Sequence, residues 1–314
     1  MGIRDFVDGH YKHFNAGELA RCTDSLREFL ASGGRLIVTL AGAMSTAEIG
    51  RSLGPAIRKQ RVHAICCTGA NLEEDLFSLI SRGEYERVPH WRQQSGEDDA
   101  ELAKRGMNRV TDVAIPESTI TKVGEKLMEL WEEAEEVGDS RFPHEYFYDL
   151  LLHGNLDFAC PPENSWLMAS ADANLPIFTP GWEDSTIGNL LAARVLDCTL
   201  KSNSIVRTGL DAMQSLADWY REDDSPTGIL QVGGGIAGDF AISVVPMLRQ
   251  DANVDVPLWS WFAQISESRA SYGGYSGAPP NEKISWGKLG VDTPRFVIES
   301  DASIVLPLLL SSLE

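Results

Sequence analysis

The chain has 314 residues, of which 43% are hydrophobic, and its 46 acidic and 27 basic residues give a formal net charge of −19. This length and composition are ordinary for a globular protein with a substantial core, either one doubly wound sheet or two average domains. The acidic excess argues against a nucleic-acid backbone as partner. It serves either solubility or the attraction of cationic ligands such as polyamines.

The cysteines, the histidines and the hydropathy pattern exclude further classes. No cysteine pair forms a CxxC motif or a metal-like spacing with the six scattered histidines, so we expect no metal site. An odd count of cysteines without a recognisable secretion signal indicates a reducing, cytoplasmic setting. No run of about 18 apolar residues would cross a membrane. The five cysteines are Cys22, Cys66, Cys67, Cys160 and Cys198.

The first third of the chain is expected to alternate strands and helices after a helical lead-in at 1–34. Short apolar runs at 35–40 (RLIVTL) and 62–67 (VHAICC) have the length of buried strands. A loop of small residues follows each run, AGAMST after the first and TGAN after the second. Helices are expected at 47–59 and from Glu73 onward, where an acidic first turn would complement the helix dipole.

The middle of the chain interrupts this alternation and then resumes it. Residues 82–118 are polar with mixed charge, and we interpret them as an insertion or flap. Amphipathic helices are expected at 118–136 and 144–152. A strand at 175–179 (LPIFT) leads to the loop PGWEDST, whose Ser185 is expected to cap the next helix.

The last third adds three strands and two helices, and the whole pattern predicts the fold. Strand, small-residue loop and helix recur at least five times, which predicts a single α/β domain with a Rossmann-like, mostly parallel sheet and helices on both faces. Ligands of such sheets bind beyond the carboxyl ends of the strands. The loops AGAM, TGANLEED, PGWEDST, GGGIAG and ESDAS are therefore expected to converge on one crevice. These late strands are expected at 228–232, 258–265 and 296–299, and the helices at 239–248 and 302–310.

Two motifs in this last third suggest chemistry. The loop GGGIAG at 233–238 satisfies GxGxxG between a strand and a helix, so its backbone could approach a pyrophosphate; a tight turn that packs helix on strand is the alternative. Lys288 lies between a glycine and a leucine. In a water-poor pocket such a lysine has a lowered pKa, and its neutral amine can form a Schiff base. An exposed lysine on a polar loop is the commoner alternative for an isolated residue.

The stretch SGAPPNEKISWGK, followed by ESDASIVLPLL, resembles the C-terminal signature of the deoxyhypusine synthase family. The spacing from Lys288 to Asp301 fits that signature without a gap, and further similarity runs through most of the chain. The resemblance implies a deoxyhypusine synthase-like NAD-binding α/β domain over residues 1–314, assembled as a homotetramer with active sites across a dimer interface. Enzymes of this family use NAD to oxidise spermidine. They pass its aminobutyl group, through an imine on the SWGK lysine, to an acceptor amine.

The same resemblance assigns roles to individual positions. Lys288 would be the nucleophile, Trp286 would cover the amine substrate and Glu282 would pair with a substrate ammonium. A tryptophan face beside a cationic amine contributes roughly 0.5–2 kcal/mol. Glu74 matches the second Glu of the family's EED motif, which contacts the NAD ribose. The cofactor-binding positions implied are Gly42, Ala43, Thr68, Gly69, Glu74, Asp184, Thr186, Gly233, Gly234, Gly235 and Asp301.

The chain departs from the family pattern at the substrate positions. Asp239 and Phe240 occupy the place of paired histidines after GGG, the first of which would be the general base. Asn189 replaces an Asp at the end of the PGWEDSTIGN segment, and Tyr275 replaces an acid just before SGA. Two anionic amine anchors are thus missing, while the lysine and the cofactor positions remain. These departures predict a changed amine substrate, with spermidine a poor donor.

The resemblance therefore implies an NAD-dependent alkylamine transferase that passes an imine on Lys288 to a small polyamine or guanidino-amine, as in family members that make homospermidine. Deoxyhypusine synthase proper, whose acceptor is a lysine of a translation initiation factor, is the first alternative. The second is a non-catalytic NAD- or polyamine-binding protein. The intact lysine argues against the second alternative, because a binder needs no nucleophile.

Overall fold

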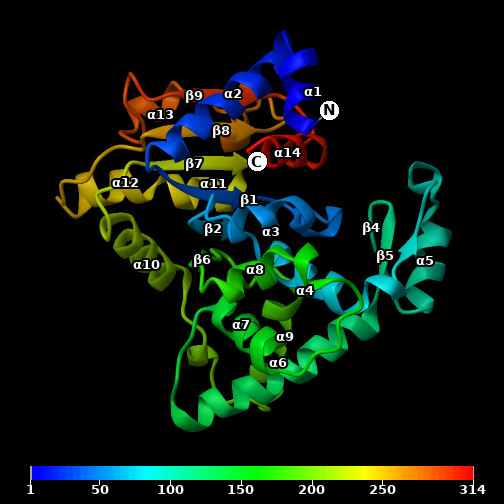
Figure 1. The fold of residues 1–314 in the computed structure, drawn as a ribbon. Helices are drawn as coiled ribbons and strands as arrows, with labels where there is room; N and C mark the ends of the chain where they lie inside the picture. Colours follow the sequence, from blue (N-terminus) through cyan, green and yellow to red (C-terminus); the bar gives the residue numbers. More distant parts are fainter. Residues whose placement is uncertain (1, 314) are drawn as a thin grey trace.

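A computed structural model describes residues 2–313, and a six-stranded sheet forms its centre (Figure 1). Every neighbouring pair of strands is parallel, in the order β6-β2-β1-β7-β8-β9. The predicted Rossmann-like α/β fold is confirmed. The strands are β1 (Arg35–Leu40), β2 (Ala64–Cys67), β6 (Ile177–Phe178), β7 (Thr227–Val232), β8 (Trp261–Ile265) and β9 (Arg295–Ile298).

The strand order reverses direction between β1 and β7. From β1 the chain adds β2 and β6 on one side, then returns to add β7, β8 and β9 on the other. This is the strand order of doubly wound dinucleotide-binding sheets, in which ligands lie at the reversal point. The register pairs Leu40 with Val232, so the loops after β1 and β7 begin side by side.

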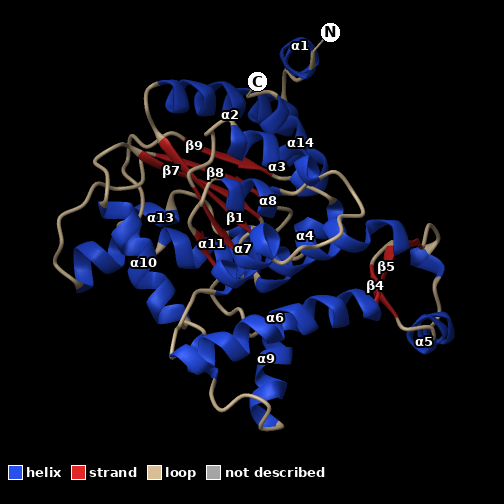
Figure 2. Ribbon diagram, turned by 60° about the horizontal axis from the view of Figure 1, so that its bottom comes forward, coloured by secondary structure: helices blue, strands red, loops and turns tan. Residues whose placement is uncertain are grey.

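Helices cover both faces of the sheet (Figure 2). Alternate residues of β1 enter separate cores, since Leu36 and Val38 belong to one buried cluster and Ile37 to the other. A strand buried on both faces explains the continuous apolar run RLIVTL. No helix of the described chain has the length and apolar character that crossing a membrane requires. The α-helices are α1 (Ile3–His10), α2 (Phe14–Ala31), α3 (Gly50–Arg58), α4 (Gly69–Ser81), α5 (Gly96–Lys104), α6 (Glu117–Val137), α7 (Pro143–His153), α8 (Trp166–Asp172), α9 (Thr186–Leu196), α10 (Gly209–Arg221), α11 (Gly235–Ile242), α12 (Val244–Pro246), α13 (Glu282–Ser285) and α14 (Ala302–Ser311).

A small antiparallel sheet projects from the main body together with α5 (Figure 1). It lies within the stretch 82–118 that the sequence pattern marks as an insertion. Val88, Leu102, Met107 and Ala114 give it a buried cluster of its own. Its strands are β3 (Glu86–Arg87), β4 (Met107–Val110) and β5 (Val113–Pro116), in the order β3-β5-β4.

Two predicted helix starts are wrong by about one turn, because caps supplied by other residues extend the helices into glycine-rich sequence. α4 begins at Gly69, where the Thr68 side chain accepts a hydrogen bond from the backbone N–H of Asn71, so the EED run is not in the first turn. α11 begins at Gly235, whose N–H donates to Ser276 Oγ at 3.2 Å. The predicted cap of α9 is confirmed, since the Ser185 side chain accepts from an α9 backbone N–H. The other predicted elements differ from the structure by a few residues at their ends, and neither α8 nor α10 is predicted from the sequence.

Candidate active site

A cavity of about 600 Å³ lies between α11, the segment after it and the loop that joins β8 to α13. This volume is in the range of small-molecule sites. Five of the residues proposed for catalysis or substrate binding line it: Lys288, Asp239, Tyr275, Trp286 and Glu282. They come from α11 and from the Gly- and Pro-rich segment before β9, which are far apart in the sequence.

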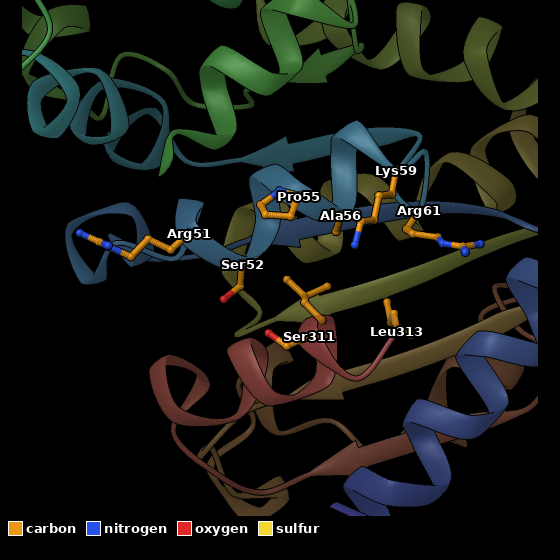
Figure 3. A pocket seen from close by; sticks show the side chains of 9 residues that line it. Arg51, Ser52, Pro55, Ala56, Lys59, Arg61, Ser311 and Leu313 are labelled. Carbon is orange, nitrogen blue, oxygen red and sulfur yellow. The ribbon is translucent and has the colours of Figure 1, made fainter. Parts of the chain in front are cut away.

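A second hollow, between α3 and the end of α14, does not have the size of a ligand site (Figure 3). Its volume is about 50 Å³, and Arg51, Arg61 and Ser311 are among its lining residues. Among residues 2–313, no group of three His, Cys, Asp or Glu side chains could hold a metal ion. Of these two hollows, only the cavity of about 600 Å³ has room for a small-molecule substrate.

Lys288 is a buried amine with a carboxylate beside it. The residue is 8% exposed, and its Nζ donates to Asp239 Oδ1 at 2.9 Å. Its backbone is held on both sides, because its N–H donates to the Lys283 carbonyl at 2.9 Å and its carbonyl accepts from Trp259 N–H at 3.2 Å. A lysine so fixed can pass a proton directly to Asp239, which is within hydrogen-bond reach.

Asp239 therefore lies where the resemblance predicts a histidine base, and it contacts the predicted nucleophile. It is on α11, one turn after Gly235, and its side chain is 50% exposed. Ser243 Oγ also donates to Asp239 Oδ1, at 3.3 Å. The position keeps a proton acceptor although the histidine is absent.

Tyr275, the residue in place of a family acid, presents its ring to the cavity. Its hydroxyl accepts a hydrogen bond from Gln231 Nε2 at 2.7 Å, and burial raises the pKa of the phenol well above its usual value. The Nζ of Lys288 lies 5.5 Å from the centre of its ring. Tyr275 thus stays neutral and meets cations through its π face, not through a charge.

A second buried lysine, which no sequence pattern marks, lines the same cavity. Lys283 is 2% exposed, and its Nζ donates to the Ala278 carbonyl at 3.1 Å. Burial, and next the charge of Lys288, lower the pKa of Lys283 to about 8. In the sequence NEKIS it resembles a surface lysine, and only the packing of the loop against β8 buries it.

Trp286 and Glu282 lie at the rim of the cavity. Trp286 is 67% exposed, which is high for a tryptophan, and its carbonyl accepts from Gln250 Nε2 at 3.3 Å. Glu282 is exposed at the start of α13. An indole at the mouth of a cavity can cover an amine that enters it, as proposed from the sequence.

The predicted cofactor positions gather at the carboxyl ends of β1, β2 and β7. Thr68 Oγ1 donates to the Gly42 carbonyl at 2.6 Å, which joins the loops after β2 and β1. A Cβ on Gly233 would lie 2.9 Å from the Ala41 side chain, so the β1 and β7 loops are in contact. Gly69 packs in the same way on Ser185 before α9. Ala43, partly buried, follows Gly42 in the β1 loop.

The three glycines after β7 do not share one purpose. A Cβ on Gly234 would lie 2.3 Å from Ser276 Oγ, so this glycine lets the loop before α13 pack on the turn. Gly235 and Gly42 have φ angles of +55° and +60°, and a Cβ on either would meet no atom within 4 Å. The GxGxxG pattern left open a tight packing turn or the approach of a pyrophosphate. Gly234 supports the packing turn, and the open space at Gly235 leaves room for a ligand.

Within the EED run, two of the three carboxylates are engaged at helix N-termini. Glu73 accepts hydrogen bonds from the backbone N–H groups of Thr186 and Ile187, at 2.9 and 2.8 Å, where α9 begins. Asp75 accepts from Leu167 N–H at 3.1 Å, where α8 begins. Both roles are structural, and they stabilise the positive ends of these helices.

Glu74 is the remaining carboxylate of the run. It is partly buried and accepts a hydrogen bond from the Thr46 hydroxyl in the β1 loop. Burial, and next the charge of Glu73, raise the pKa of Glu74 to about 8. Further hydrogen bonds from hydroxyl groups, such as those of a ribose, would stabilise this partly buried carboxyl group.

Asn71, which the sequence patterns do not single out, ties the same loops together. It is fully buried on α4, and its Nδ2 donates to the Gly42 carbonyl and to Thr68 Oγ1, both at 2.8 Å. Its Oδ1 accepts from Ser45 N–H at 3.0 Å. An asparagine immediately after TGA is the only sequence signal, and it marks a structural role in shaping the β1 loop.

The other predicted residues do not line the Lys288 cavity. Asp184 and Thr186 are exposed in and after the loop that follows β6. Asn189 Nδ2 donates to the carbonyls of Glu183 and Ser185, so its amide holds that turn. Asp301 caps α14, accepting from Ser303 N–H at 2.7 Å. Within one chain, the predicted cofactor positions and Asn189 lie apart from the other predicted substrate positions, which surround Lys288.

Comparisons with known proteins identify relatives of the chain and proteins of similar fold. A family model described as deoxyhypusine synthase matches residues 9–313. The chain is 27% identical to a deoxyhypusine synthase-like protein of Cyanothece sp., over 98% of this chain and 78% of that protein. It is 28% identical to "Probable deoxyhypusine synthase 2" of Methanosarcina mazei, over 99% and 86%. A crystal structure from Entamoeba histolytica described as a deoxyhypusine synthase covers 99% of this chain and 92% of its own, with a TM-score of 0.60 and 13% identity, a likeness of fold.

Proposed function

The chain belongs to the deoxyhypusine synthase family, and we propose that it is an NAD-dependent alkylamine transferase whose acceptor is a small polyamine or guanidino-amine. Membership of the family supports transfer of the aminobutyl type. The observation that carries the finer proposal is the pair formed by Lys288, 8% exposed, and Asp239, 2.9 Å away, in a cavity of about 600 Å³. A binding protein would have no use for a buried amine beside a proton acceptor.

The chain's own residues account for the group transfer. Oxidation removes a hydride and a proton from the donor amine and leaves a carbon–nitrogen double bond. Lys288, once neutral, adds to that carbon, and the original amine leaves with the proton that Asp239 took from the lysine. The acceptor amine then displaces Lys288 by the same steps in reverse, and return of the hydride completes the product.

The loops at the carboxyl ends of the strands are placed to hold a dinucleotide. A side chain at Gly42 or Gly235 would project into open space at the reversal point of the sheet. Glu74 is the carboxyl group there with capacity for ribose hydroxyls. We propose that Glu74, Asp184, Asp301 and the loops after β1, β2 and β7 hold NAD. When bound, NAD supplies the acceptor for the hydride.

Replacing Glu74 by alanine is expected to weaken NAD binding about tenfold, because two hydrogen bonds between the ribose hydroxyls and the Glu74 carboxyl group, of roughly 0.5–1.5 kcal/mol each, are lost. Calorimetric titration of the wild type and the variant measures this directly. Glu132→Ala is the matched control, since Glu132 is exposed on α6, and it should bind NAD as the wild type does. Equal affinity for Glu74→Ala would remove Glu74 from the site.

Spermidine is expected to be a poor donor. Tyr275 in the cavity and Asn189, which a second copy of the proposed homo-oligomer would bring to it, are neutral where the family pattern has carboxylates. A terminal ammonium therefore loses two charge-assisted bonds of roughly 1.5–3 kcal/mol each. Incubation with NAD and a panel of amines, with products identified by mass, should show a shorter or guanidino-bearing amine turned over at least about tenfold faster. Efficient turnover of spermidine would contradict this expectation.

Deoxyhypusine synthesis on a lysine of a translation initiation factor is the second candidate. The similarity of the chain to "Probable deoxyhypusine synthase 2" of Methanosarcina mazei favours this candidate. The same incubation with the initiation factor added separates the two candidates, because a mass increase on the factor appears only in deoxyhypusine synthesis. We also propose a homo-oligomer, a tetramer by analogy with the family, in which a second copy brings the loops at its strand ends to the Lys288 cavity.

A further inference from the structure

Lys283 carries a charge that the chain does not balance. Its Nζ lies 4.9 Å from the ring centre of Tyr275 and 5.1 Å from that of Phe262, and its hydrogen bond goes to the neutral Ala278 carbonyl. Among the ion pairs of the described residues, none involves Lys283, and the Asp239 carboxylate of this cavity pairs with Lys288. A buried ammonium without a counter-ion is costly, and two aromatic rings offset only part of that cost.

The other charged groups of the cavity lie toward its opening. Glu282 on α13 and Asp251, in the segment after α12, are both exposed lining residues. Asp239 on α11 is engaged by Lys288. The buried end therefore has an unpaired positive charge at Lys283, and the rim is negative. A ligand that is complementary to these charges places a negative group next to Lys283 at the buried end and an ammonium group at the negative rim.

We propose that one of the two amines that react at Lys288 bears a carboxylate, and that this carboxylate pairs with Lys283. The inference rests on the proposed function and deepens it, since it identifies one substrate as an amino acid-type amine while the other can remain a polyamine. Lys283 is then a specificity-determining residue. Its lowered pKa supports the same conclusion, because an anionic partner would restore the charged form that burial and Lys288 disfavour.

Three amines with the same four-carbon chain test the proposal by calorimetry on the full-length protein: 4-aminobutanoate, 1,4-diaminobutane and butylamine. The wild type should bind 4-aminobutanoate at least about tenfold more tightly than the other two, since one buried charge-assisted pair is gained. Lys283→Met should lose about tenfold or more for 4-aminobutanoate and little for butylamine. Lys283→Arg, which keeps the charge, should retain the preference.

Tighter binding of the diamine by the wild type would overturn the proposal, and so would no detectable binding of 4-aminobutanoate or an unchanged affinity in Lys283→Met. If Lys283→Met fails to fold, the order of the three amines on the wild type decides alone. Binding needs no turnover, so the two proposals fail separately. A carboxylate preference without group transfer refutes only the proposed reaction, and transfer between polyamines without that preference refutes only the role of Lys283.

Discussion

Lys288→Ala is expected to reduce group transfer by about 10³-fold or more, because the residue that would carry the imine is removed. NAD affinity should stay within about twofold, since the loops at the strand ends do not include this side chain. Lys288→Arg should fail equally, because a guanidinium stays protonated and cannot attack. Transfer rates are measured from product masses, and NAD affinity by calorimetry.

Borohydride reduction in the presence of donor and NAD tests the same prediction by a different route. It should leave a stable adduct on Lys288 in the wild type and on no residue in Lys288→Ala. Lys201, whose side chain is 85% exposed, is a suitable control position, and Lys201→Ala should form the adduct normally. An adduct on Lys283, or full transfer by Lys288→Ala, would move the nucleophile away from Lys288.

The sequence predicts the six strands of the main sheet and most of the helices, but neither the helices α8 and α10 nor the order of the strands. Runs such as RLIVTL are apolar on both faces because parallel strands lie between two helical layers, and this signal is local. The position of β7 beside β1 depends on contacts between residues that are far apart in the sequence, and no local pattern predicts it. The starts of α4 and α11 were misplaced because glycine-rich sequence resembles a loop, whereas Thr68 and Ser276 cap these helices there.

The candidate site shows the same division between local and distant information. The signature around Lys288 predicts a nucleophile, but it does not predict that Asp239, on a different helix, accepts a hydrogen bond from this lysine. The replacement of an acid by Tyr275 was visible, yet its consequence depends on the ring's approach to two lysines. Lys283 had no signal, since nothing in NEKIS distinguishes a buried lysine from an exposed one.

The pairing of Asp239 with Lys288 suggests how the chain manages without the family's histidine. A lysine must lose its proton before it attacks an imine, and a carboxylate 2.9 Å from Nζ can take it with no intervening water. A cationic donor amine that enters the cavity would compete with Lys288 for this carboxylate. This makes Asp239 both a partner of the resting lysine and the expected base.

Asp239→Asn is accordingly expected to lower kcat by about 10²-fold or more while changing KM much less, because the amide keeps the shape of the side chain but accepts no proton. Asp239→His, which restores the residue type of the family pattern, should recover part of the rate. Its kcat should rise with pH through about 6–7, as a histidine with a pKa near 6.5 loses its proton.

Ser243→Ala, which removes only a 3.3 Å hydrogen bond to Asp239, is the matched control and should lower kcat about threefold or less. Steady-state rates over about pH 5–9 for the four proteins give the answer. A full rate in Asp239→Asn would place the base elsewhere, and Lys283, a second amine in the cavity, whose pKa is lowered by burial, would be the next residue to replace.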